Sequence, residues 1–216
     1  DSPSPLSGTH SKLAFDRLLY FSDAVFAIAI TLLALELRLP EDVAGGGDAL
    51  WHALGAMWPK YLSFLVSFMV IGLYWQGHHR MFRLINRFDD RLLWINLLFL
   101  MCIVVIPFPT SVLGEHANQP AAVVFYACVL ALTGLLQLAM WLYATFARRL
   151  VEVSLDDRQY RFLQRLVGAR MAIPPLVFLL SVAVARYSPT WVEYSWILIA
   201  PALALVSRIG RSAASN

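Results

Sequence analysis

A carboxylate inside an apolar stretch is the first feature of this 216-residue sequence that could do chemistry. Asp23, preceded by Ser22, lies near the start of the apolar run Leu18–Leu37. Arg17 comes just before that run and, on a helix, shares a face with Phe21 four residues later. Because charge is costly in hydrocarbon, such a carboxylate indicates a satisfied polar cluster or a path for a solute.

The sequence GLYWQGHHR, at the end of a second apolar stretch, supplies candidate partners for Asp23. Trp75 is three residues before His78 and four before His79, so either imidazole can share its helix face. Asn96, at the start of a third stretch, lies at a similar depth. Three interpretations stay open. The favoured one is a structural cluster joining three helices, and the others are a proton or ion site and a metal site. Adjacent histidines point apart, and no H-E-x-x-H pattern supports a metal.

A second pattern follows Asp23 in the same apolar run. Ile28, Thr31, Leu32 and Leu35 are spaced i, i+3, i+4 and i+7, which places them on one stripe of a helix. Small alanines beside this stripe would permit close helix approach. The periodicity alone fits plain packing as well as the wall of a pore.

The composition predicts an all-α integral membrane protein. Hydrophobic residues make up 59% of the chain and charged residues 14%, and the mean hydropathy is +0.64. A soluble domain of this length could not bury so much apolar surface. Both cysteines lie in apolar stretches, and their spacing fits neither a disulfide scaffold nor a zinc site.

Six apolar stretches are long enough to cross a hydrocarbon core of about 30 Å as helices. Prolines predict bends in the third, fifth and sixth of them. We expect a disordered cytoplasmic tail over 1–14, a six-helix membrane domain over 15–209 and a flexible tail over 210–216. Ser154 with Asp157 predicts a short interfacial helix before the fifth span. The six spans are Leu18–Leu37, Leu50–Gln76, Leu92–Leu113, Ala121–Phe146, Val167–Tyr187 and Trp191–Ser207.

The basic residues predict the orientation. Most of the 17 Lys and Arg residues fall before the first span, after the second, after the fourth or after the sixth, all on one side. The excess of basic residues on the cytoplasmic side of membrane proteins then places both termini in the cytoplasm. The net charge of +3 is explained by this topology, and binding to nucleic acid is not expected.

A motif at the start of the first span extends these inferences. Arg17, Phe21, Ser22 and Asp23 form R-x-x-x-F-S-D, followed by AVFAIAITLLALEL, and the second span carries W-x-x-H-H. Together with six spans, this pattern resembles the bacterial members of the endolysosomal potassium channel family called transmembrane protein 175. The resemblance implies a homotetramer with a central pore lined by the first helix, in a bacterial inner membrane.

The resemblance also implies roles for individual residues. It makes Ile28, Leu32 and Leu35 apolar pore constrictions and Thr31 a polar pore ring. The expected function is a potassium-favouring cation leak channel, with the lipid bilayer and permeating potassium as partners and with no catalysis, cofactor or bound metal. It implies a structural packing network of Arg17, Phe21, Ser22, Asp23, Trp75, His78 or His79, and Asn96.

The channel reading has physical consequences and rivals. No T-V-G-Y-G stretch is present, so a ladder of carbonyl oxygens is not expected, and an apolar ring would close by dewetting. The main alternative is a secondary transporter or proton-coupled carrier that uses Asp23 and the histidines of the second span. An intramembrane enzyme would need paired catalytic groups at membrane depth, and an assembly protein would have no transport role.

Overall fold

The computed structural model is all-helical, as the composition predicts. It describes residues 5–39, 47–85, 87–146, 150–151 and 156–185, together with Val192 and Trp196, and side chains from residue 13 onward. The helices in this part of the chain are α1 (Pro5–Leu35), α2 (Gly47–Ala56), α3 (Trp58–Phe82), α4 (Asp90–Val105), α5 (Pro107–Glu115), α6 (Pro120–Thr145) and α7 (Asp157–Val184).

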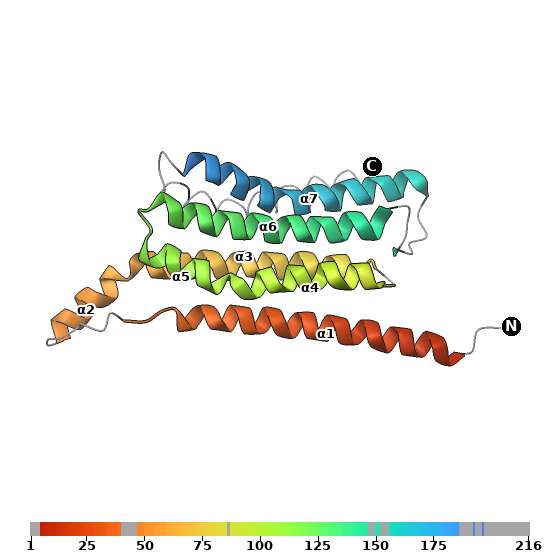
Figure 1. The fold of residues 1–216 in the computed structure, drawn as a ribbon, viewed down its shortest axis with the longest axis horizontal. Coiled ribbons are helices and arrows are strands. Elements are labelled where there is room, and N and C mark those ends of the chain that lie inside the picture. The colour runs from red at the N-terminus through yellow and green to blue at the C-terminus, as the bar shows by residue number, and fades with distance from the viewer. Residues whose placement is uncertain are drawn as a thin grey trace.

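The helices pack in layers, with α1 on one side of the bundle and α7 on the other (Figure 1). α1 contacts α3, α4 and α5 in the middle layer, α4 contacts α6, and α6 in turn contacts α7. Helix α2 projects from the amino-terminal end of α3, away from the bundle (Figure 1). Among the described residues, α1 therefore has neighbours of its own chain on one face only.

Five of the six predicted spans are present in the described residues. The helix pair α2 and α3 forms one of them, bent by 46°. The other four are long and apolar enough to cross a membrane as they stand, and they are Leu13–Leu35, Asp90–Glu115, Pro120–Thr145 and Asp157–Val184. The sixth predicted span, Trp191–Ser207, and the predicted tail over 210–216 lie outside the described residues, apart from Val192 and Trp196.

The start of α1 differs from the prediction. We expected disorder over 1–14 and a span starting at Leu18, but α1 already begins at Pro5. Extending an existing helix adds one hydrogen bond for each residue fixed, so polar residues before an apolar helix can continue it. Proline suits the first turn of a helix because the N–H that it lacks would have no partner there.

The second span is broken where one helix was predicted from Leu50 to Gln76. Helix α2 ends at Ala56, and α3 restarts at Trp58 with Pro59 in its first turn. Proline has no backbone N–H to continue the hydrogen bonds of α2, whereas it suits the first turn of a new helix. The break at Met57 therefore follows from Pro59, whose effect the apolar pattern concealed.

Prolines act differently in the third and fifth spans. In the third span the helix is interrupted at the proline, because α4 ends at Val105 and α5 begins at Pro107. The Thr110 hydroxyl donates to the Ile106 carbonyl, 2.8 Å away, beside this break. In the fifth span, α7 continues through Pro174 and Pro175 without ending.

The start of α7 also corrects the sequence prediction. We expected a short interfacial helix that began near Ser154 and stood apart from the span at Val167. Instead one helix runs from Asp157 to Val184. Asp156 caps it, accepting from the Gln159 amide at 2.7 Å, while the Gln159 side chain reaches back to the Asp156 amide. This capping box starts the helix two residues after the predicted cap.

The contact between α6 and α7 depends on a glycine. A Cβ atom placed on Gly134 would lie 2.7 Å from Cδ of Pro175. A contact this short forces the backbones apart, because the proline ring cannot rotate away. Gly134 thus lets α7 pack closely on α6 at the point where Pro175 would otherwise obstruct it.

We predict that Gly134→Ala destabilises the protein by about 1–3 kcal/mol through this overpacking. The matched control is Gly72→Ala in α3, where an added Cβ meets nothing within 4 Å. The midpoint of thermal unfolding in detergent should fall for Gly134→Ala and hold or rise for Gly72→Ala. Equal midpoints for the two variants would show that the α6–α7 contact does not need the glycine.

Candidate functional site

Helix α1 has a buried face. Leu18, Ser22, Phe26, Ala29 and Leu33 recur every three or four residues and are at most 8% exposed. This spacing follows one side of a helix, the side that packs on α3, α4 and α5. One polar residue, Ser22, lies on this side among the apolar ones.

The opposite face of α1 carries the stripe singled out in the sequence. Ile28 and Leu35 are 56% and 58% exposed, Thr31 is exposed and Leu32 is partly exposed. The Thr31 hydroxyl donates to the Ile28 carbonyl at 2.8 Å. Its single proton is thereby used along the helix, and its oxygen keeps a lone pair free to face outward. The stripe is therefore an apolar surface interrupted by one oxygen acceptor.

A hydrogen-bonded chain fixes the buried face of α1. The Asn96 amide donates to Ser22 Oγ at 3.2 Å, and its oxygen accepts from His78 Nε2 at 2.9 Å. Ser22 Oγ in turn donates to the Leu18 carbonyl at 2.9 Å. All three side chains are at most 1% exposed. This hydrogen-bonded series of side chains, Ser22–Asn96–His78, links α1 to α4 and α3 without a charged group.

Of the two adjacent histidines, His78 belongs to this chain. Its ring stacks on Phe99 at a centroid distance of 5.7 Å and an angle of 4°. Phe82 lies 4.4 Å away and Phe26 5.7 Å away. His79 is exposed and stacks on Trp75 with centroids 5.7 Å apart. The two imidazoles point apart, as expected for neighbours on a helix.

Asp23 forms a separate contact. It is exposed and accepts from Trp75 Nε1 at 2.9 Å. Arg17 and Phe21 are exposed as well, and among the described side chains no hydrogen bond joins Arg17 to Asp23. The single buried cluster expected from the sequence is thus split in two. Successive residues point about 100° apart on a helix, and here Ser22 faces the interior while Asp23 does not.

Sequence reasoning missed several residues that complete this site. Phe99, the ring beneath His78, lies three residues after Asn96, so helical spacing could have identified it. Arg38 lies three residues beyond Leu35, in the segment that follows the end of α1, and it is exposed. Its Nε donates to the Leu35 carbonyl at 3.0 Å. Within the described residues, no group of three or more His, Cys, Asp or Glu side chains could hold a metal ion.

Comparison with known proteins places this geometry in a family. The profile described as "Endosomal/lysosomal potassium channel TMEM175" matches residues 17–107. A potassium channel of Streptomyces collinus is 38% identical over 176 residues, which cover 80% of this chain and 82% of that protein. This chain belongs to the TMEM175 family.

A solved structure and an animal relative extend the TMEM175 comparison. The crystal structure of a lysosomal potassium-selective channel TMEM175 homolog from Chamaesiphon minutus superposes with a TM-score of 0.75. It is 30% identical and covers 89% of this chain and 97% of its own. The endosomal/lysosomal proton channel TMEM175 of Danio rerio is 25% identical over 199 residues, which are 36% of its length. The matched region includes the stripe and the Ser22–Asn96–His78 chain, so both lie in the part shared with TMEM175 proteins.

We predict that Asn96 and His78 are energetically coupled. Asn96→Leu leaves a buried imidazole N–H without an acceptor and should cost about 1–3 kcal/mol. In a double-mutant cycle with His78→Phe, the combined loss should be smaller than the sum by about 0.5–3 kcal/mol.

Thermal unfolding in detergent measures both losses. The control is Trp75→Phe, which removes the exposed bond to Asp23 and should have a smaller effect. Strictly additive losses for Asn96→Leu and His78→Phe would mean that the bond between Asn96 and His78 does not contribute to the stability of the protein.

Proposed function

We propose that this protein is a potassium-favouring cation channel whose ion path is lined by the exposed face of α1. One observation carries the proposal: α1 packs on its own chain through one face and leaves the stripe of Ile28, Thr31 and Leu35 uncovered. A lone apolar helix face with one hydroxyl oxygen suits the wall of a narrow pore. Membership of a family of potassium channels supports the same function.

A pore of this kind needs several chains. We propose a homotetramer of six-span subunits, with four α1 helices around a central axis. The distribution of basic residues supports a multi-pass orientation with both termini in the cytoplasm. The bacterial origin of the potassium channel relative supports a place in a bacterial plasma membrane.

The proposed mechanism relies on hydration. Rings of Ile28, Leu32 and Leu35 offer no ligand, so at small radius they exclude water and close the path. Where the path is wide enough for a partly hydrated ion, four Thr31 oxygens would replace some lost water. Potassium gives up its hydration more easily than sodium, so a single weak ring favours potassium only modestly. The Thr31–Ile28 bond supports this role because it turns the oxygen lone pairs away from the helix.

The buried hydrogen bonds among Ser22, Asn96 and His78 have an indirect part in this function. Ser22, Asn96 and His78 hold the rotation of α1 relative to α3 and α4. Turning α1 by one residue's spacing, about 100°, would replace the stripe with different side chains. The Trp75–Asp23 bond holds the same end of α1 from outside the core.

Proton conduction or proton-coupled carriage through Asp23 and the histidines is the second candidate. The proton channel name of the Danio rerio relative favours it. Against it, His78 is enclosed by three aromatic rings and bonded to an amide that cannot titrate. Asp23 and His79 are exposed but contact Trp75 and not each other.

Ion flux in liposomes tests the proposal, with potassium, sodium and proton gradients compared in turn. Potassium flux should exceed sodium flux, and both should exceed leakage from empty liposomes. Leu35→Ala removes bulk from the outermost apolar ring and should raise potassium flux by about threefold or more, since a wider ring stays hydrated. The matched control is Leu180→Ala in α7, on the far side of the bundle, with a leucine that is 67% exposed.

Two results would contradict this reading. An unchanged flux for Leu35→Ala, with a conducting unmodified protein, means that the stripe does not limit the path. Proton flux that is abolished by Asp23→Asn while potassium flux is absent would favour the carrier.

A further inference from the structure

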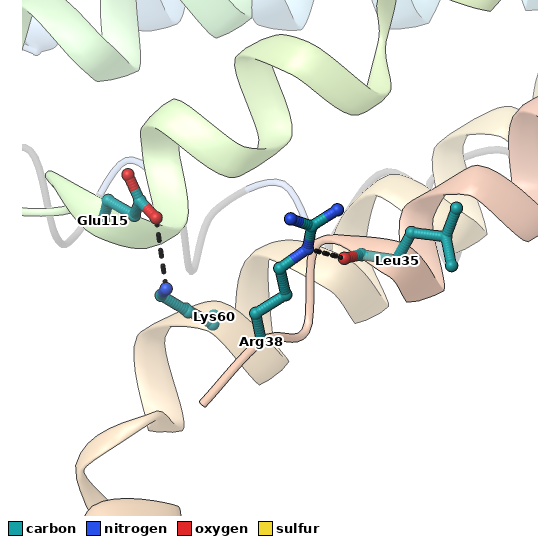
Figure 2. Close-up of polar contacts among 4 residues, drawn as sticks. All are labelled: Leu35, Arg38, Lys60 and Glu115. Carbon is teal, nitrogen blue, oxygen red and sulfur yellow. Dashed lines mark hydrogen bonds and ion pairs between the residues drawn. The ribbon is translucent and has the colours of Figure 1, made fainter. Parts of the chain in front are cut away.

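The outer end of α1 carries a charge that the proposed pore does not use. Arg38 lies three residues after Leu35, in the non-helical segment that follows α1, and is exposed. Its Nε donates to the Leu35 carbonyl at 3.0 Å, and the terminal nitrogens of the guanidinium point toward α5 (Figure 2). The side chain thus caps the carboxyl end of α1 and keeps a full positive charge there.

An ion pair stands next to this cap. Lys60 Nζ, in the first turns of α3, lies 3.1 Å from Glu115 Oε1 at the end of α5 (Figure 2). The side chains of Lys60 and Glu115 are 24% and 52% exposed. Within the described residues, the Arg38 guanidinium makes no ion pair with a carboxylate.

A cavity of about 400 Å³ joins these charges to the stripe. Arg38, Glu36 and Glu115 line it together with Leu32 and Leu35. A charge placed at this cavity therefore lies beside the apolar residues that we assign to the constriction. The remaining walls come from α4 and α5 and consist of Val104, Pro107, Phe108, Ser111 and Val112.

Within the described residues, the charges around the cavity balance. Two acids, Glu36 and Glu115, lie with two bases, Arg38 and Lys60, so this group of four side chains is neutral in each subunit. The carboxyl end of a helix adds a partial negative charge of about half an elementary charge. Loss of Arg38 would leave a net negative charge that attracts cations, and Arg38 is the base nearer to the stripe.

We propose that Arg38 limits the rate at which cations enter the outer mouth, by cancelling the negative potential of the α1 carboxyl end and the neighbouring acids. This inference rests on the proposed pore, in which four Arg38 side chains would surround the entrance. A positive ring opposes the approach of cations, and the opposition weakens as salt screens it. Arg38 is therefore a residue that sets conductance without contacting the ion in the constriction.

Single-channel conductance in planar bilayers separates this electrostatic role from a structural one. Arg38→Gln removes the charge but keeps an N–H donor, whereas Arg38→Lys keeps the charge. At ~20 mM potassium chloride, Arg38→Gln should raise conductance about twofold or more, and at ~1 M the difference should nearly vanish because the screening length falls to about 3 Å. Arg38→Lys should stay near the unmodified protein at both salt concentrations.

Two further variants serve as matched controls. Lys60→Gln removes the same charge from the same group but farther from the stripe, so its effect at low salt should be smaller. Arg161→Gln removes an exposed charge from α7, across the bundle from α1, and should change nothing.

The proposal is overturned if Arg38→Gln conducts like the unmodified protein at ~20 mM salt, where the screening length is about 20 Å and the charge should still act. It is also overturned if Arg38→Gln and Arg38→Lys change conductance equally at both salt concentrations, because Arg38 would then act only as a cap. An unmodified protein without potassium conductance would instead reject the proposed function. The two failures are therefore distinguishable.

Discussion

The need to satisfy buried polar groups in hydrocarbon is the constraint on which the rest of the structure depends. Water cannot reach Ser22, Asn96 and His78, so each must find its partner within the chain. Their three side chains bond in series and leave one acceptable rotation for α1. The buried face then packs on α3 and α4, and the opposite face turns outward. The position of the stripe is thus a consequence of a hydrogen-bonded chain one to four turns away.

A second polar cluster stabilises the packing of α3, α5 and α6 next to the proline break between α4 and α5. Ser67 in α3 bonds to both the Thr110 hydroxyl and the Tyr126 hydroxyl, each at 2.8 Å. Thr110 lies just after the break between α4 and α5, so this cluster ties the interrupted span to α3 and α6. Interhelical hydrogen bonds of this kind are modest individually, but here they hold a helix where proline has interrupted its own bonds. The α5 side of the break is therefore held to α3 and α6.

The sequence was sufficient for features that depend on composition or helical spacing. Apolar length predicted the spans, and the i, i+3, i+4, i+7 pattern placed Ile28, Thr31 and Leu35 on one face. It was insufficient where two adjacent residues compete for one face. Ser22 and Asp23 were assigned to one cluster, although a helix separates them by about 100°. It also could not tell which of His78 and His79 meets Asn96, because that choice depends on the packing of Phe99 and Phe82.

The other errors concern helix ends. Hydropathy is continuous across Met57, so the break set by Pro59 was invisible to a count of apolar residues. At α7 the cap is Asp156, two residues after the predicted Ser154, and its partner Gln159 completes a reciprocal pair of bonds. Apolar length therefore locates a span, whereas local backbone chemistry decides where its helix begins.

The central claim is that the exposed face of α1 lines a water-filled ion path. The most direct test is modification of cysteines by a charged, water-soluble methanethiosulfonate during potassium current recording, with Cys102→Ala and Cys128→Ala as background. Thr31→Cys should react and lose current, and Ala29→Cys, on the fully buried face, should do neither. If Thr31→Cys is modified without any change in current, or if Ala29→Cys is the variant that blocks, α1 does not present this stripe to the ion.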